Sequence, residues 1–391
     1  MTFTPEQGFQ GFQGFQGFQG FQGFQGFQGF QGFQGFQGGA SGAYAGPLIT
    51  TRDGIVGPWE VPAGNPEALT QGDVVNMDRW QGGSRGAVYL FELASCLSFS
   101  VRDGRAHLWH IEVDENNAGG APLGIFQPLC AMKRPTIEQF KEQLGFLETY
   151  SALRPERASE IVAQLGLPFA FLSSLGFMSA ERTPWTIELL NVSLMLANHT
   201  AQRMKHALAC KRPIEFSSQV QPIIPTPDHG TLPSGHATEA FITATVLTSL
   251  LTASNDPVFD NTQAATQLMR LASRIAINRT VAGVHFPVDS VAGAILGATM
   301  GNYLVARASE ATAYRSSSFN GEDFTPSQDF IWKDAMSISG GAIEVHDADT
   351  QADLSGIGAF MDVETVQIAP QNGSELLKDL WKRALAEWAV N

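Results

Sequence analysis

The chain has 391 residues and a formal net charge of −14 at pH 7, with 43% hydrophobic and 16% charged residues. It exceeds one typical domain and can bury a full hydrophobic core, as expected of a globular protein. Its acidity argues against nucleic acid and anionic membrane surfaces as general partners. Cys96, Cys130 and Cys210 form neither a CxxC pattern nor a Cys/His zinc spacing, so disulfide scaffolding and structural zinc are not expected.

Charge is unevenly distributed along the chain. Ten Asp or Glu residues and one basic residue, Lys333, lie between Glu322 and Glu364, whereas residues 203–279 are locally basic. This distribution fits a small anionic substrate that binds in one basic pocket of an acidic protein.

The first residues and the apolar runs of the chain indicate whether the protein is exported or spans a membrane. Residues 1–7 have no basic start and no apolar core, so no secretory signal is predicted. The longest apolar runs, near 240–251 and 291–305, are shorter than the ~18 residues that suggest a membrane span. We therefore expect a soluble, cytoplasmic protein without a membrane span.

Residues 8–37 are ten copies of Gly-Phe-Gln. Gly at every third position is typical of collagen, but the repeat has no proline to pre-set the backbone, so a triple helix is not expected. Uncharged repeats of this composition favour a disordered, self-associating tract. The predicted tract, residues 1–40, is either a dispensable tail or a device for assembly, and we expect a homo-oligomer.

The next predicted unit, residues 41–134, combines a linker with a small β-containing region. Gly and Pro punctuate residues 38–65 and predict an extended linker. Residues 86–101 and 105–113 are rich in Val, Leu, Phe and Trp, and they flank an Asp-Gly turn at Asp103. This arrangement predicts a β-hairpin.

Helical patterns begin after Pro135. Thr136 and Gln139 form a capping-box pattern, and apolar residues recur at helical spacing as far as Tyr150. Further helices are predicted at 155–165, 185–209, 236–253, 262–281 and 287–311. Together they predict a mainly α chain with a helical bundle over residues 135–311. The last unit, residues 312–391, is predicted to be acidic and irregular to about residue 365 and to end in an amphipathic helix at 374–390.

The first of three candidate site segments runs from Lys205 to Pro213. Lys205 and Arg212 are seven residues apart, which predicts two cations on one helical face. Pro213 disfavours helix at the residue before it, so the helix is expected to end at Arg212. Taken alone, the segment also fits a solvated basic face.

The second segment is Pro233-Ser234-Gly235-His236, which directly precedes a predicted helix. Gly235 lets a ligand approach the backbone closely, and Ser234 suits the N-cap position. The free N–H groups at a helix N-terminus are donors for an anion.

The third segment runs from Asn278 to Asp289. Pro287 suits the first turn of a helix, which places His285 just before it. Asp289 can then accept a hydrogen bond from the His285 ring and fix its tautomer. Taken alone, His285 also fits a structural histidine.

Together the segments contain K-x6-RP, PSGH and R-x5-H-x3-D in that order. This composite pattern resembles the signature of the superfamily shared by vanadium-dependent haloperoxidases and type 2 phosphatidic acid phosphatases, over roughly residues 135–310. One departure is Asn278, which stands where the family often has Ser. The resemblance implies a helical bundle of the haloperoxidase/acid phosphatase type.

The resemblance also implies roles for the site residues. His285 would bond the vanadium of a vanadate cofactor, or act as the nucleophile toward phosphorus. His236 would be the acid–base group on the opposite side, and Asp289 would orient His285. The oxyanion would be held by Lys205, Arg212, Ser234, Gly235 and Arg279.

Three functions remain open from the sequence. A vanadium-dependent haloperoxidase would use hydrogen peroxide to oxidise a halide, with bromide expected, whereas a soluble acid phosphatase would hydrolyse a small phosphate ester through a phosphohistidine. In a third alternative, the repeats drive self-association and the pocket is vestigial. His229 favours the first, because it lies seven residues before His236, where algal bromoperoxidases also carry a histidine. An exposed loop residue is the alternative interpretation of His229.

Overall fold

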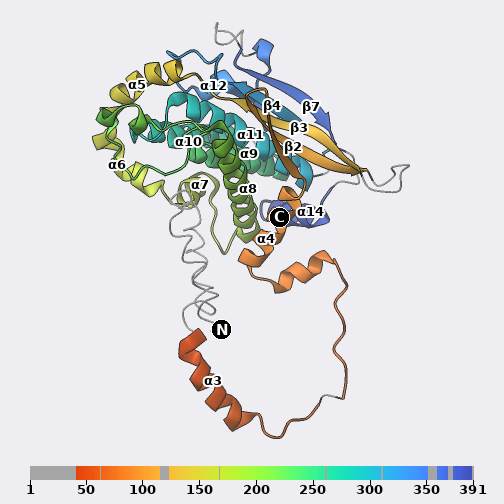
Figure 1. Ribbon diagram of the computed structural model, residues 1–391. Helices are drawn as coiled ribbons and strands as arrows, with labels where there is room; N and C mark the ends of the chain where they lie inside the picture. Colours follow the sequence, from red (N-terminus) through yellow and green to blue (C-terminus); the bar gives the residue numbers. More distant parts are fainter. Residues whose placement is uncertain are drawn as a thin grey trace, which may run out of the picture.

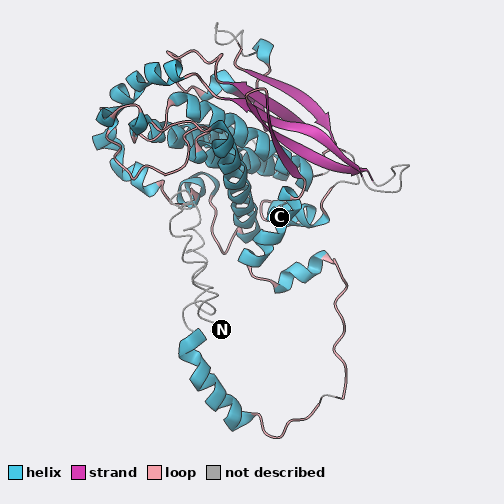
Figure 2. Ribbon diagram, in the orientation of Figure 1, coloured by secondary structure: helices cyan, strands magenta, loops and turns pink. Residues whose placement is uncertain are grey.

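The computed structural model describes residues 41–61, 63–114, 123–166, 168–259, 262–309, 311–350, 359–368 and 373–389. Its body consists of a group of helices with a sheet along one side, and helix α3 (Ser41–Ile55) lies apart from this body (Figure 1). Helices dominate the fold (Figure 2), which confirms the mainly helical class. The Gly-Phe-Gln tract lies outside the described residues.

The predicted helices between residues 135 and 311 are present. They are α5 (Ile137–Ser151), α6 (Arg154–Ala163), α8 (Pro184–Leu208), α9 (Gly235–Ser254), α10 (Thr262–Val281) and α11 (Pro287–Ala308). The capping box of α5 is also present, since Thr136 Oγ1 accepts from Gln139 N at 3.2 Å and Gln139 Oε1 accepts from Thr136 N at 2.7 Å. Helix α7 (Phe169–Gly176) and the short 3-10 helices η3 (Val74–Arg79), η4 (Pro213–Glu215) and η5 (Ser218–Val220) were not predicted.

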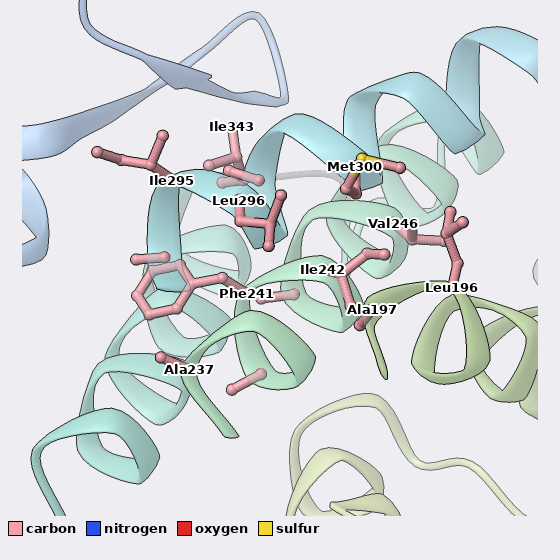
Figure 3. Close-up of a cluster of buried hydrophobic side chains, with 14 of the residues drawn as sticks. Leu196, Ala197, Ala237, Phe241, Ile242, Val246, Ile295, Leu296, Met300 and Ile343 are labelled. Atoms are coloured by element: carbon pink, nitrogen blue, oxygen red, sulfur yellow. The ribbon is translucent and has the colours of Figure 1, made fainter. Parts of the chain in front are cut away.

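Helix α9 lies at the centre of the core, where buried side chains of α8, α9 and α11 meet, among them Ala197, Ile242 and Met300 (Figure 3). The backbones of α9 and α11 approach closely along a row of glycines on α11. A Cβ atom at Gly293 would lie 2.5 Å from the Ser234 carbonyl oxygen, and one at Gly297 would lie 2.5 Å from that of Thr238. This approach brings the N-termini of the two helices together.

The five-stranded sheet has the order β1-β2-β3-β4-β7, and β3–β4 is its parallel pair. Its strands are β1 (Leu97–Arg102), β2 (Arg105–Asp114), β3 (Leu123–Lys133), β4 (Ala313–Asn320) and β7 (Met361–Gln367). The predicted hairpin is confirmed at its turn, where Asp103 and Gly104 have φ values of 52° and 71°. Positive φ at both central residues is what a tight hairpin turn requires.

The predicted start of the first strand is wrong. Residues Gly82–Ala94 form helix α4, in which Gly86, Tyr89 and Leu93 are buried at spacings of three and four. That spacing matches a helical period, which the richness in Val, Leu and Phe obscured. The extended conformation predicted for the linker is also wrong from Ser41 to Ile55, which form α3.

The prediction of an irregular segment up to about residue 365 is wrong as well. This segment contributes β4 and β7 to the main sheet, forms the two-stranded sheet of β5 (Met336–Ser339) and β6 (Ala342–Val345), and contains α12 (Trp332–Ala335). The inward positions of β4 include Ser317, which bonds Thr299 on α11, so hydrophobic alternation alone did not reveal the strand. The amphipathic C-terminal helix is confirmed as α14 (Glu375–Ala386). The division of the chain into units stays a prediction.

The close approach of α9 and α11 leads to a stability prediction. Gly297→Ala should lower the free energy of unfolding by about 1–3 kcal/mol, because the new methyl group overpacks the α9 backbone. Gly145→Ala is the matched control, since Gly145 is exposed on α5 and nothing lies within 4 Å of a Cβ there. That change should raise the free energy by about 0.5–1 kcal/mol. Urea denaturation measures both, and an unchanged stability for Gly297→Ala would contradict the close packing.

Candidate active site

The structure brings the three sequence segments to one place at the start of α9 and α11. Lys205 comes from the last turn of α8, Arg212 and His229 from the long connection to α9, and Arg279 from the end of α10. We call the candidate site the set that the sequence predicted: Lys205, Arg212, His229, Ser234, Gly235, His236, Arg279, His285 and Asp289.

Lys205 and Arg212 do not share a helical face, and this part of the prediction is wrong. Helix α8 ends at Leu208, because Ala209 adopts φ 51° and its N–H bonds the Lys205 carbonyl at 3.0 Å. Both cations nevertheless point to the same region. The buried Lys205 Nζ donates to the carbonyl oxygens of Gly230 and Thr231 at 2.9 and 3.0 Å.

Arg212 ties together the connection and the turn before α11. Its Nε donates to the His229 carbonyl at 2.9 Å, and its Nη1 donates to the Val284 carbonyl at 2.8 Å. The same Nη1 lies 3.0 Å from His285 Nε2, and Nη2 lies 3.0 Å from His229 Nδ1. His229 is therefore a half-buried neighbour of the site and not an exposed loop residue.

The His285 ring is held on its Nδ1 side. This atom lies 3.1 Å from Asp289 Oδ2, so the predicted hydrogen bond is present. The same carboxylate oxygen accepts from the Thr231 hydroxyl at 2.5 Å and from the Phe286 N–H at 2.8 Å. With Nδ1 donating, Nε2 keeps its lone pair and accepts from Arg212. His285 thus presents an unprotonated nitrogen to the cations.

Burial sets the protonation of this region. It holds the pKa of His285 and of His236 well below the ordinary value, and the neighbouring cations act in the same direction. Burial also raises the pKa of Asp289 to about 6, against the opposing effect of its hydrogen bonds and of nearby cations. Both rings are therefore neutral near pH 7.

The start of α9 supplies hydrogen-bond donors. Ser234 is the N-cap, with its Oγ accepting from the Ala237 N–H at 3.4 Å, and its own N–H bonds the Asp289 carbonyl at 2.9 Å. The N–H groups of Gly235 and His236 lie in the first turn, where no intrahelical acceptor exists. They and the positive end of the helix dipole favour an anion here.

Arg279 is fully buried and only partly paired. Its Nη2 donates to Gln164 Oε1 at 2.9 Å and to the Ile161 carbonyl at 3.3 Å. Its Nε and Nη1 have no hydrogen-bond acceptor among the described residues. Burial lowers its pKa to about 10, which leaves it charged near pH 7. A buried guanidinium with two idle donors is costly unless an anion binds it.

Sequence reasoning missed Thr231 and Gln164. Thr231 bonds the Asp289 carboxylate, whereas Gln164 Oε1 accepts from both Arg279 and Asn278. Asn278, the departure from the family pattern, also donates to Glu160 Oε1 at 3.0 Å. No motif marks these partners, because they come from other segments and only the fold brings them near.

A cavity of about 30 Å³ lies between His236, Arg279 and His285. The remaining lining residues are apolar, namely Leu165, Ile224, Pro225, Pro227 and Val284. This volume exceeds the roughly 10–15 Å³ that one water requires, and it suits a small inorganic ion better than an organic group.

The Thr231 hydroxyl should measurably stabilise the site. Thr231→Val should lower the free energy of unfolding by about 1–3 kcal/mol, because it leaves the buried Asp289 carboxylate without one donor. Thr231→Ser keeps a hydroxyl and should retain most of that free energy. Urea denaturation near pH 7 distinguishes them, and equal losses for Val and Ser would show that the hydroxyl contributes little.

Two further properties concern the described residues as a whole. No helix among them is long and apolar enough to cross a membrane. In the same part of the chain, no group of three or more His, Cys, Asp or Glu side chains is placed to hold a metal ion.

Comparison with known proteins places the candidate site within a family. Residues 188–312 match the family model described as PAP2 superfamily, and this segment contains every residue of the candidate site. No curated protein matches the chain. Residues 188–312 are thus similar to the PAP2 superfamily, which covers the vanadium haloperoxidases and type 2 phosphatases.

Proposed function

We propose that this protein is a vanadium-dependent haloperoxidase that oxidises a halide, with bromide expected, by means of hydrogen peroxide. The observation that carries the proposal is the pairing of an unprotonated His285 Nε2 with a buried, half-unpaired Arg279. One atom can bond vanadium, and the other group can hold the charged oxygens. The match of residues 188–312 to the PAP2 superfamily supports the broader class of phosphatase or haloperoxidase.

The residues of the candidate site fit vanadate. The idle Nε and Nη1 of Arg279 and the first-turn N–H groups of Gly235 and His236 would donate to its oxygens. Lys205, Arg212 and Ser234 would add donors and positive charge, and His285 would be the vanadium ligand. When bound, vanadate supplies Lewis-acid activation of peroxide toward the halide.

The residues of the candidate site would then orient the His285 ring and control where protons are held. Asp289 and Thr231 keep the proton of His285 on Nδ1, so that Nε2 faces the anion. His236 lies across the same cavity with a neutral ring, so it can accept a proton there and return it. The apolar lining limits water beside these groups.

Two observations favour the haloperoxidase over a phosphatase. The cavity of about 30 Å³ is lined by apolar side chains apart from His236, Arg279 and His285, and its size suits peroxide or a halide. His229 adds a second imidazole beside Arg212, and its buried Nε2 has no hydrogen-bond partner among the described residues. That nitrogen can serve a ligand.

A phosphatase is the second candidate, because the same unprotonated Nε2 of His285 could attack phosphorus once it gives up its hydrogen bond with Arg212. The cations would then stabilise the transferring phosphoryl group, and His236 would protonate the leaving oxygen.

Orthovanadate and phosphate should compete for one site, because both are tetrahedral oxyanions suited to the same donors. Calorimetric titration of each anion, alone and in mixture, measures this. His285→Ala should weaken vanadate far more than phosphate, since it removes the bond to vanadium and leaves the cations. Independent binding of the two anions would contradict a shared pocket.

Protein loaded with vanadate should brominate an indicator dye with bromide and peroxide, well above free vanadate at equal concentration. His229→Ala should lower this rate more than it lowers vanadate affinity, because the imidazole contacts Arg212 and is not the vanadium ligand. His199→Ala, at an exposed position on α8, is the control and should change neither. Efficient phosphate-ester hydrolysis by the metal-free protein, without bromination by the loaded protein, would favour the phosphatase instead.

A further inference from the structure

Glu239 is a charged residue of α9 to which neither the predicted site nor the proposed function gives a role. It lies four residues after Gly235 and three after His236, so all three belong to one side of the helix. Side chains of a helix tilt toward its N-terminus. The Glu239 carboxylate therefore extends back over the first turn, where the candidate anion donors are.

The cations of the candidate site flank this position. Lys205 runs along the first turn of α9, since its Cε would lie 4.0 Å from a Cβ at Gly235. Lys205 on α8 and Arg279 on α10 are the charged groups that act on Glu239, and both lower its pKa. On its own helix the titratable neighbour is His236. Glu239 is thus the acidic member of a cluster that otherwise carries positive charge.

Among the described residues, the Glu239 carboxylate has no direct partner. Its side chain makes no hydrogen bond and no ion pair with any other described residue, although two cations are near. It is also only partly exposed to solvent. A carboxylate held beside cations without pairing with them is free to change protonation when another anion arrives.

We propose that Glu239 is a positioning residue of the oxyanion site that takes up one proton when the anion binds. An ionised carboxylate would repel the anion across the first turn, whereas the protonated form removes that repulsion and can donate a hydrogen bond. The inference depends on the anion-binding part of the proposed function and not on its redox chemistry.

The protonation of the free protein agrees with this role. Burial raises the pKa of Glu239 to about 7, and Lys205 and Arg279 oppose that rise without cancelling it. A bound dianion would raise the pKa further. Above pH 7, binding must therefore bring a proton with it, and affinity should fall by up to about tenfold per pH unit.

Sulfate is a suitable probe, because it is a tetrahedral dianion that carries no proton of its own near neutral pH. Calorimetry in buffers of different ionisation enthalpy counts the protons taken up per sulfate bound. At about pH 8 the unmodified protein should take up nearly one proton. No uptake at that pH would overturn the inference without any variant.

Glu239→Gln mimics the protonated side chain and should abolish most of this uptake. With a pKa of about 7 in the free protein, the variant should bind sulfate about tenfold more tightly at about pH 8 and equally at about pH 6. Glu142→Gln removes an equal charge from an exposed position of α5 and should leave both properties unchanged. Thermal denaturation checks that both variants fold.

Lys205, Asp289 and the three histidines of the candidate site are the competing proton acceptors. Full proton uptake retained in Glu239→Gln would assign the proton to one of them and overturn the inference. Absence of sulfate binding to the unmodified protein at any pH would contradict the oxyanion site of the proposed function, and this inference with it. The two failures are therefore distinguishable.

Discussion

The close approach of α9 and α11 is the constraint on which the candidate site depends. Glycines on α11 let the two backbones meet, and the Ser234 N–H then reaches the Asp289 carbonyl at 2.9 Å. This hydrogen bond joins the start of α9, where the backbone N–H donors lie, to the first turn of α11, which directly follows His285. A side chain at Gly293 would push these helix ends apart. The geometry of the candidate site therefore depends on the packing of the core.

Burial of positive charge follows from this arrangement. Lys205, Arg212 and Arg279 are each at most 3% exposed, and burial alone would make such a group of cations unfavourable. Carbonyl oxygens accept from Lys205 and Arg212, whereas Nε and Nη1 of Arg279 have no acceptor in the part of the chain that the structure describes. The buried charge of Arg279 is therefore incompletely compensated in the free protein, and a bound anion would compensate it. Preorganised donors of this kind bind developing or resident negative charge strongly, because nothing must rearrange when it arrives.

Local patterns predicted most helices between residues 135 and 311, because their caps and periods are properties of short segments, whereas α3, α4 and α7 were missed. The capping box at Thr136 and the first-turn Pro287 both marked true helix starts. Tertiary pairing escaped prediction. Strand β4 pairs with β3 across nearly two hundred residues, and its serines show no hydrophobic alternation. The same holds for the candidate site. The sequence motifs identified its residues, whereas the contact of Thr231 with Asp289 depends on tertiary structure and was not predicted.

A crystal structure of the protein with tungstate would test the central claim most directly, namely that this site holds a tetrahedral oxyanion. Tungstate is a tetrahedral oxyanion like vanadate, and the anomalous scattering of tungsten locates it without ambiguity. We predict a tungsten peak next to His285 Nε2, with oxygens bonded by the idle nitrogens of Arg279 and by the Gly235 N–H. Tungstate bound only elsewhere, with these donors facing water, would contradict the account.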